Sequence, residues 1–230
     1  MDEQKYPIAE IFRSPQGEGV WSGVAMTFVR FAGCNVGKPY TNPERVALAS
    51  NPLAVIHPYQ EKCVDAFGNA FSCDTNFHKT ASMTVQEIVD VCDGCERVCL
   101  TGGEPLLHNL LPLIEALRLA NKLTHIETSG TLSTAPYVDK AWITISPKQG
   151  YLVDELENAN EIKVLVGEGF NEAKFIEAFG KYIEWSMVCI SPINYEHQIN
   201  HDNVGLCLDL QRRHTKLRLS LQLHKVIGCR

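Results

Sequence analysis

The sequence lacks the features of a membrane protein, of an exported protein and of an electrostatic nucleic-acid binder. No run approaches the roughly 18 apolar residues that a membrane-spanning helix needs. The opening MDEQKYP has no basic segment followed by an apolar one, as an export signal would. Basic residues are outnumbered, 21 Lys and Arg against 27 Asp and Glu, for a net charge of -6. We therefore expect a soluble, cytoplasmic protein that makes no direct contact with nucleic acid or membrane.

Internal repeats, low-complexity tracts and linker-like segments are also missing from the sequence. Of the 230 residues, 45% are hydrophobic, which is enough to build one full core. We expect a single domain over residues 1–230.

Cysteine is the residue present in excess. An odd number of cysteines without an export signal disfavours a disulfide framework and favours metal, cluster or redox use for some of them. The nine are Cys34, Cys63, Cys73, Cys92, Cys95, Cys99, Cys189, Cys207 and Cys229.

Short apolar segments alternate with amphipathic ones along most of the chain. Strands are predicted over residues 8–12, 25–31, 97–101, 125–128, 142–146, 161–166, 187–191 and 217–221. Helices are predicted after a capping box at Thr84 and Glu87, from Pro112, and over residues 171–180 and 203–213. This alternation predicts an α/β fold with a parallel sheet. Because a complete eight-fold barrel takes about 250 residues, we predict an open, partial TIM-like barrel of about six parallel β/α units.

One segment interrupts the alternation, at about residues 34–77. It contains Pro39, Pro43, Pro52 and Pro58 and little periodicity, apart from one helical turn at residues 44–49. We predict a long functional loop or insertion there.

Chemically useful residues follow several predicted strands, where a parallel barrel places its active groups. These segments are Cys34, Thr101-Gly102-Gly103-Glu104-Pro105, Glu127-Thr128-Ser129-Gly130 and Ser146-Pro147-Lys148. Glycine lets the backbone approach a ligand closely, and a glutamate accepts hydrogen bonds from an ammonium group. Taken alone, the Gly-Gly-Glu-Pro run also fits an ordinary strand-to-helix turn, although the functional interpretation is favoured.

With further motifs, these segments resemble the radical S-adenosylmethionine (SAM) enzymes and, within them, the 7-carboxy-7-deazaguanine synthase family. The further motifs are Gln16-Gly17-Glu18-Gly19, Arg30-Phe31-Ala32-Gly33-Cys34-Asn35, Cys73-Asp74-Thr75-Asn76-Phe77, Glu127 to Thr131 and the tail Leu219 to Lys225. The resemblance covers nearly the whole chain.

The resemblance implies a [4Fe-4S] cluster held by three cysteines, with one iron left open for SAM. Reductive cleavage of SAM would give a 5′-deoxyadenosyl radical, so that no protein side chain is the reactive species. The implied reaction converts 6-carboxy-5,6,7,8-tetrahydropterin to 7-carboxy-7-deazaguanine, a precursor of queuosine and other 7-deazapurines, with loss of ammonia. It also implies Mg²⁺, a homodimer and an electron donor such as a flavodoxin.

The cluster cysteines depart from the usual C-x3-C-x2-C spacing. Cys34 aligns by the residues before it and Cys73 by those after it, and Cys63 is the cysteine between them, at intervals of 28 and nine residues. Closure entropy grows slowly with loop length, so such a spacing still permits three thiolates to converge. The competing set of Cys92, Cys95 and Cys99 is predicted to be structural, as are Cys189 and Cys207. Cys229 receives no role.

The family resemblance also assigns the remaining site residues. Arg30 would pair with the pterin carboxylate, and Thr75 would be a Mg²⁺ ligand. The implied SAM site is Ser72, Cys73, Asp74, Gly103, Glu104, Glu127, Ser146, Pro147, Lys148, Ser191, Pro192, Ile193 and Asn194. The implied substrate site is Pro15, Gln16, Gly17, Glu18, Arg30, Thr101, His224 and the terminal carboxylate of Arg230. His224, taken to lie in a strand, has a structural interpretation equally open to it.

Two alternatives differ in class. A glycyl-radical-activating enzyme shares the Gly-Gly-Glu-Pro run but does not explain residues 16–19 or the tail at 219–225. A non-catalytic iron-sulfur or zinc regulatory domain explains the cysteine count and predicts metal binding without SAM cleavage.

Overall fold

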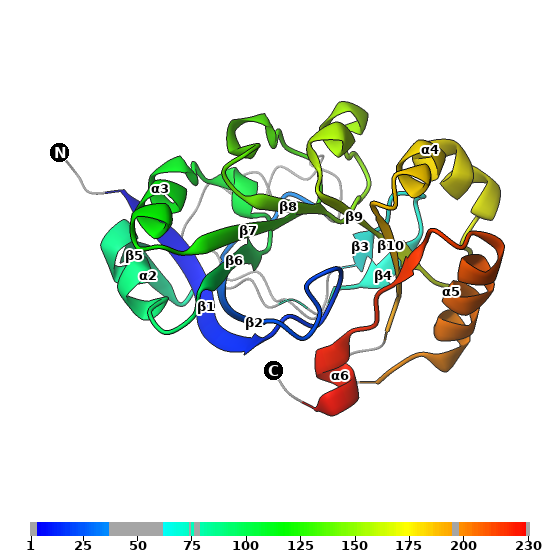
Figure 1. The fold of residues 1–230 in the computed structure, drawn as a ribbon, viewed down its shortest axis with the longest axis horizontal. Coiled ribbons are helices and arrows are strands. Elements are labelled where there is room, and N and C mark those ends of the chain that lie inside the picture. The colour runs from blue at the N-terminus through cyan, green and yellow to red at the C-terminus, as the bar shows by residue number, and fades with distance from the viewer. Residues whose placement is uncertain (1–3, 37–61, 74, 76–78, 195–197, 229–230) are drawn as a thin grey trace.

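A computed structural model describes residues 4–36, 62–73, 75, 79–194 and 198–228 (Figure 1). The predictions for Asp74, Cys229, Arg230, the prolines of the long loop and its helical turn lie outside the described residues. No helix in the described ranges is long and apolar enough to cross a membrane.

Within the described ranges, nine strands form the main sheet, in the order β11-β10-β9-β8-β7-β6-β2-β1-β5. Seven of them pair in parallel: β2 (Ala25–Phe31), β6 (Arg97–Gly102), β7 (Leu123–Thr128), β8 (Trp142–Ile145), β9 (Glu161–Val166), β10 (Val188–Pro192) and β11 (Arg218–Leu219). The long strand β1 (Lys5–Pro15) is antiparallel to β2 and to β5 (Ala81–Thr84). Because β5 and β11 are the two edges, the sheet is curved but not closed, which confirms the predicted partial barrel (Figure 1).

Helices cover the outside of this sheet (Figure 1). They are α2 (Val85–Val91), α3 (Leu111–Leu119), α4 (Glu172–Glu184) and α5 (His201–Arg213), with a short α6 (Leu223–Ile227) near the end of the chain. The predicted capping box opens α2, since the Thr84 hydroxyl accepts from the Glu87 amide and the Glu87 carboxylate accepts from the Thr84 amide. The β7–β8 and β8–β9 connections carry 3₁₀ turns, Ala135–Tyr137 and Val153–Asn158, in place of the α-helices of a regular barrel.

Side chains of the parallel strands alternate between two faces, as strand geometry requires. In β9, Ile162, Val164 and Val166 are buried in the apolar core with the helices. Glu161 and Lys163, which alternate with them, line a pocket inside the barrel. The outer face therefore stabilises the fold, at about 1.5–3 kcal/mol for each large side chain fully buried, and the inner face is left for polar groups.

Part of the long insertion is an ordered hairpin of β3 (Lys62–Val64) and β4 (Ala70–Ser72). Its turn is closed by the Asp65 carboxylate, which accepts hydrogen bonds from the amides of Phe67 and Asn69, each 2.8 Å long. The hairpin docks on the segment after β8 through a bridge between Asp65 and Lys148 and a 3.0 Å hydrogen bond from the Gln149 amide to the Val64 carbonyl. This contact brings Cys63 to the carboxyl ends of the parallel strands.

The end of the chain differs from the prediction. The strand predicted over residues 217–221 is limited to Arg218–Leu219, and His224 lies in α6, not in a strand. The alternating leucines of this tail mimic a strand, but the Leu223 amide donates to the Gly17 carbonyl at 2.8 Å and the chain turns into a helix. Gly228, at a φ of 67°, ends that helix in the left-handed region.

Candidate functional site at the carboxyl ends of the strands

Glu104 is the centre of a hydrogen-bonded brace between β6 and β7. Its fully buried carboxylate accepts from the Leu106 amide (3.1 Å), the Thr128 hydroxyl (2.8 Å), and the amide (2.9 Å) and hydroxyl (2.5 Å) of Ser129. These donors occupy both of its oxygens. In this structure Glu104 holds the Thr128-Ser129 turn in place, while its predicted contact with SAM stays a prediction.

Gly103 lets two strand ends meet backbone to backbone. A Cβ placed on it would lie 1.8 Å from the Gly33 carbonyl oxygen and 3.1 Å from the Cys34 Cβ. The Gly103 amide donates to the Phe31 carbonyl at 3.1 Å, and the Glu104 amide donates to Gly33 at 2.9 Å. The Gly-Gly pair therefore fixes the position of Cys34 through backbone contacts that only glycine permits.

A second set of hydrogen bonds connects Asn35 to the same brace. The Asn35 side-chain amide donates to the Thr131 hydroxyl at 2.9 Å, and the Thr131 and Ser129 hydroxyls are 2.9 Å apart. The buried Asn35 carbonyl oxygen has no hydrogen-bond partner among the described residues. An unsatisfied buried acceptor beside Cys34 is a position at which a ligand N–H or O–H would be stabilised.

The three predicted cluster cysteines share one electrostatic neighbourhood. Burial raises the pKa of Cys34 to about 12, and Glu104, Cys63 and Cys73 add to the increase. Burial also raises the pKa of Cys63 to about 11, although the ammonium of Lys148 opposes the rise. Thiols that perturb one another in this way lie close together, across intervals of 28 and nine residues.

Cys34, Cys63 and Cys73 are thiols, the donor type that iron-sulfur clusters take. Among the described side chains, no group of three His, Cys, Asp or Glu is arranged to hold one metal ion. Thiols resist deprotonation in this site unless a metal or a cation compensates, and Lys148 supplies one cation.

The segment after β8 carries the predicted Ser146-Pro147-Lys148 motif. The Lys148 ammonium donates to the hydroxyl (2.7 Å) and the carbonyl (3.0 Å) of Ser146, and it lies 5.8 Å from the centre of the Phe71 ring on the hairpin. Burial lowers the pKa of Lys148, and Cys63 counteracts part of that effect. The motif therefore faces the thiols.

The turn after β10 contains Ser191 to Asn194, and Ser191 and Pro192 are buried. Asn194 accepts from the Asn200 amide at 2.8 Å and donates to the Gln222 side chain at 2.9 Å. The Ile193 carbonyl accepts from the Asn203 side chain at 2.6 Å. The turn is thus held by α5 and by the C-terminal segment. Ser72 ends β4, and Thr75 lies two residues after Cys73.

A polar pocket lies inside the barrel. It is lined by Gln16, Glu18, Trp21, His125, Glu127, Thr144, Glu161 and Lys163. At the amino end of the strands Trp21, His125 and Trp142 pack edge to face or tilted, with ring centres 5.3 to 6.4 Å apart, and Arg97 lies 4.0 Å over Trp21. Burial and, to a smaller extent, the positive charge of Arg97 lower the pKa of His125 to about 4. His125 is therefore uncharged at neutral pH.

The predicted substrate residues Gln16 and Glu18 face this pocket. Gln16 donates to Glu127 at 2.8 Å, and the Lys163 ammonium contacts the Glu18 carboxylate. Burial alone would raise the pKa of Glu18, but Lys163 lowers it to about 2. Pro15 ends β1 directly before them.

Arg30 and Thr101 are side by side in the parallel register of β2 and β6. Arg30 donates to the Glu10 carboxylate at 2.8 Å and lies 5.1 Å from the centre of the Phe12 ring, with 29% of its side chain exposed. Its guanidinium is held in place by β1. Only one of its five N–H donors is needed for the bond to Glu10, so the others can bind a ligand.

His224 packs against the substrate loop from α6. A Cβ on Gly17 would lie 2.3 Å from the His224 Nδ1 atom, and the Gly19 amide donates to the Ser220 hydroxyl at 2.8 Å. The C-terminal segment and residues 16–20 therefore form one wall, as Figure 1 shows for α6 and the β1–β2 turn.

Four of the remaining described cysteines are consistent with structural roles, whereas Cys95 is only partly buried. Cys92, Cys99, Cys189 and Cys207 are buried, and burial raises the pKa of each thiol. Cys99 packs with Met26 and Phe28 inside the barrel. Neutral buried thiols of this kind behave as small apolar side chains.

Sequence reasoning missed Lys163, Glu161, His125 and Trp21. For two of them a signal was available in β9. Glu161 and Lys163 alternate there with apolar residues, whereas a parallel strand buried on both faces is apolar throughout. No comparable pattern marks Trp21, which lies in a turn.

An open parallel barrel with three thiols gathered at the carboxyl ends of its strands is the architecture of the radical SAM enzymes. No protein-family model matches the chain. Curated relatives named 7-carboxy-7-deazaguanine synthase include those of Synechocystis (30% identity, 98% of this chain and 94% of that one), Escherichia coli (31%, 97% and 99%) and Bacteroides thetaiotaomicron (32%, 97% and 98%). The crystal structure of QueE from Escherichia coli superposes with a TM-score of 0.65 at 29% identity, over 95% of this chain and 94% of that one.

The chain belongs to the 7-carboxy-7-deazaguanine synthase family. This finding confirms the family predicted from the motifs and decides against both alternative classes.

Proposed function

We propose that the protein converts 6-carboxy-5,6,7,8-tetrahydropterin to 7-carboxy-7-deazaguanine. The observation that carries the proposal is that one barrel, in a chain of this family, contains both a polar pocket and a rim of strand ends that bears thiols. This rim consists of Gly33, Cys34, Gly103 and Glu104 with the neighbouring Cys63 and Cys73. Gln16, Glu18 and Glu127 offer an amide and carboxylates to the polar edges of a pterin, and Arg30 offers a guanidinium for its carboxylate.

In this proposal Cys34, Cys63 and Cys73 hold a [4Fe-4S] cluster, and SAM binds beside it. The SAM site is bounded by Gly103 with its Glu104 brace, Glu127, the Ser146 to Lys148 segment and the Ser191 to Asn194 turn, with Ser72 and Asp74 flanking Cys73. The cluster that these cysteines would hold would supply, when reduced, the electron for reductive cleavage of SAM.

The chain itself binds, orients and excludes water. Gln16, Glu18 and the backbone of Pro15 to Gly17 orient the heterocycle, Thr101 and Arg30 hold its far side, and His224 closes the wall. The floor of Trp21, His125 and Trp142 keeps solvent from the amino end of the barrel. Exclusion of water protects a radical intermediate from side reactions.

The proposal includes Mg²⁺ at Thr75. A single hydroxyl is a weak site, but Mg²⁺ keeps several waters and accepts substrate oxygens, so Thr75 would need to supply only one of its ligands. Turnover should then require Mg²⁺, and activity unaffected by its removal would refute the site.

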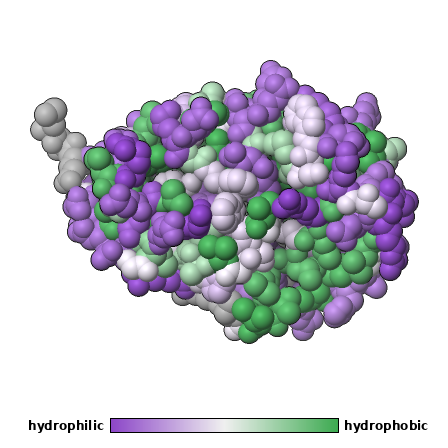
Figure 2. All heavy atoms as spheres, in the orientation of Figure 1, coloured by the Kyte–Doolittle hydropathy of each residue, from purple (hydrophilic) through white to green (hydrophobic). Residues whose placement is uncertain are grey.

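Partners and location are also proposed. Figure 2 shows apolar surface gathered around α6, which carries the exposed Val226 (51%) and Ile227 (56%), and a homodimer would cover such a surface. Analytical ultracentrifugation of the wild type and of Val226→Glu would test it, and a monomeric wild type would contradict it. A flavodoxin-type donor in the reducing cytoplasm is proposed to deliver the electron.

The decisive experiment is anaerobic reconstitution with iron and sulfide, followed by incubation with SAM, reductant, Mg²⁺ and 6-carboxytetrahydropterin. We expect 5′-deoxyadenosine and 7-carboxy-7-deazaguanine, both identified by mass spectrometry. Absence of both products would refute the proposed function, and 5′-deoxyadenosine alone would refute the proposed substrate.

A further inference from the structure

Four residues from three parts of the chain form a closed polar ring in the barrel pocket. The Lys163 ammonium contacts the Glu18 carboxylate and lies 3.8 Å from the Glu127 carboxylate. Glu127 accepts from the Gln16 side chain at 2.8 Å, and the Gln16 side-chain oxygen accepts from the Glu18 amide at 3.2 Å. The ring joins the β1–β2 turn to β7 and β9, and Lys163 is its only cation.

Lys163 is almost fully enclosed, since 7% of its side chain is exposed, against 16% for Glu18 and 24% for Glu127. Charged and titratable groups face this pair from each element packed around it. They are Glu161 on β9, Glu127 on β7, Cys99 on β6, Cys189 on β10, Lys148 after β8 and His224 on α6. Gln222 also hydrogen-bonds to Glu18.

Lys163 is the cation that compensates the carboxyl groups of this pocket. Glu18, Glu127 and Glu161 bring three carboxyl groups to one pocket, and one oxygen of the buried Glu161 has no hydrogen-bond partner among the described residues. Like charges in an enclosed site favour protonation of one carboxyl group unless a cation compensates. The raised pKa of Lys163 reflects the attraction of Glu127 and Glu18, which outweighs burial.

We propose that Lys163 is a positioning residue, whose ammonium holds Glu18 and Glu127 in fixed orientation and keeps Glu18 ionised, so that the Glu18 carboxylate can accept hydrogen bonds from the N–H groups of the pterin. The inference rests on the proposed function for its substrate. Lys163 acts through the two carboxylates, because they and Gln16 occupy its surroundings. Nothing in the motif pattern of the family assignment includes it.

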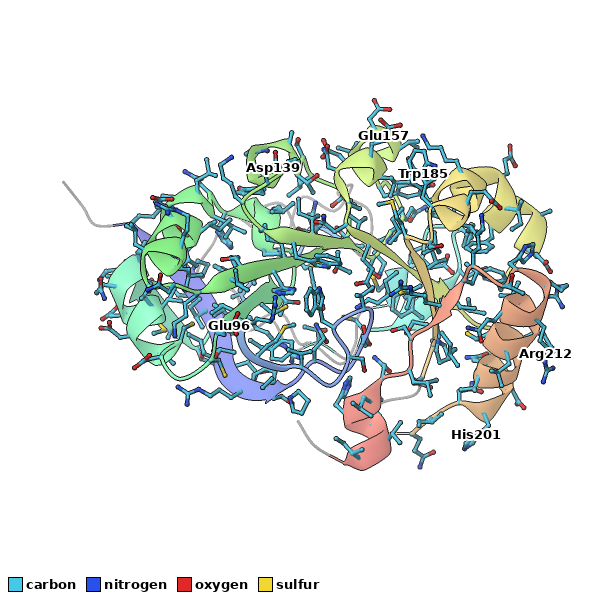
Figure 3. All side chains as sticks on the ribbon, in the orientation of Figure 1. Glu96, Asp139, Glu157, Trp185, His201 and Arg212 are labelled. Atoms are coloured by element: carbon cyan, nitrogen blue, oxygen red, sulfur yellow. The ribbon has the colours of Figure 1, made fainter. Side chains whose placement is uncertain are left out.

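Three variants test the proposal. Lys163→Met keeps the length of the side chain and removes the charge, Lys163→Arg keeps the charge, and Lys181→Met is the matched control. Lys181 pairs with Glu157 at 2.8 Å on the surface, where 52% of its side chain is exposed and Figure 3 shows Glu157 pointing outward.

For Lys163→Met we expect kcat/KM to fall by about 100-fold, the scale of a misplaced binding group. The acid limb of its pH profile should move up into the range of about pH 6 to 8, because one carboxyl group now takes up a proton. Lys163→Arg should keep the wild-type profile, and Lys181→Met should match the wild type in both readouts. A uniform loss of kcat/KM with an unmoved pH profile would overturn the proposal.

A titration separates this inference from the proposed function. Carbon-13 NMR of labelled glutamate, with Glu18→Gln to assign the signal, follows the Glu18 carboxyl without turnover. In the wild type it should titrate well below the usual glutamate value of 4.5, and in Lys163→Met above it. An unchanged titration overturns the role of Lys163 even if turnover falls. A wild type that makes no deazaguanine overturns the proposed function, while the shifted titration would still support Lys163 as the residue that keeps Glu18 ionised.

Discussion

Replacing Gly103 by alanine is the sharpest test of how the rim is built. The added Cβ would lie 1.8 Å from the Gly33 carbonyl oxygen and 2.6 Å from its carbonyl carbon, where 3.4 Å is an ordinary contact. The segment that carries Cys34 must therefore move by about 1.6 Å, the difference between 3.4 and 1.8 Å. Backbone atoms cannot rotate away as a side-chain end can, so the strand ends must separate.

The cost follows from two effects. Overpacking typically costs about 1–3 kcal/mol. Loss of the 2.9 Å hydrogen bond from the Glu104 amide to the Gly33 carbonyl adds about 1 kcal/mol. At roughly 2–4 °C per kcal/mol for a chain of this size, we expect Tm to fall by about 4–16 °C.

Thermal unfolding and the iron and sulfide content after reconstitution would measure the effect. Gly103→Ala should lose stability and bind less cluster, because Cys34 is displaced. Gly205→Ala is the matched control: the glycine lies within α5, no atom lies within 4 Å of its added Cβ, and we expect it to stabilise the protein by about 0.5–1 kcal/mol. A Gly103→Ala protein with wild-type Tm and full cluster content would refute this account of the rim.

Three further outcomes are expected. Cys63→Ala should abolish the cluster absorbance whereas Cys92→Ala and Cys95→Ala should retain it, and the reverse pattern would show that the wrong thiols were chosen. Glu18, whose pKa is about 2 against an ordinary 4.5, should contribute stability that is complete above pH 4.5 and lost as pH falls from there towards 2. Urea unfolding at pH 5 and pH 3 should therefore show a smaller pH dependence in Glu18→Gln than in the wild type, and equal dependence would contradict the ion pair. Glu104→Gln places an amide N–H group against the hydroxyl of Thr128 or the amide of Ser129, which both donate to Glu104. It should lower the free energy of unfolding by about 1–3 kcal/mol in the same assay. An unchanged value would show that the hydrogen bonds to Glu104 do not stabilise the fold.

The fold was predictable because its signals are local. Capping at Thr84, the apolar alternation of the parallel strands and the amphipathic helices each arise from residues a few positions apart, and the structure has all of them. The tail failed for the same reason: alternating leucines indicate a strand locally, but the contact that decides the outcome is between Leu223 and Gly17, at opposite ends of the chain.

The rim could be predicted from the sequence and the ion pair in the pocket could not, for a physical reason. Backbone approach admits few residue types, so Gly102 and Gly103, taken together with the other strand-end motifs, mark this part of the site in the sequence. An ion pair admits any lysine and any glutamate, so Lys163 carries no signature of its partner Glu18 until the strands are in place.

The contrast between backbone contacts and an ion pair determines which substitutions each part of the site tolerates. A rim fixed by glycine contacts has no substitute for them, because every other side chain overlaps the Gly33 backbone. The ring around Lys163 is fixed by charge, so Lys163→Arg can preserve it where Lys163→Met cannot. Cluster assembly should therefore depend on shape at Gly103 and be insensitive to charge at residue 163, whereas the pH dependence of substrate binding should follow the charge at residue 163. Loss of cluster in Lys163→Met at full folding would contradict this separation.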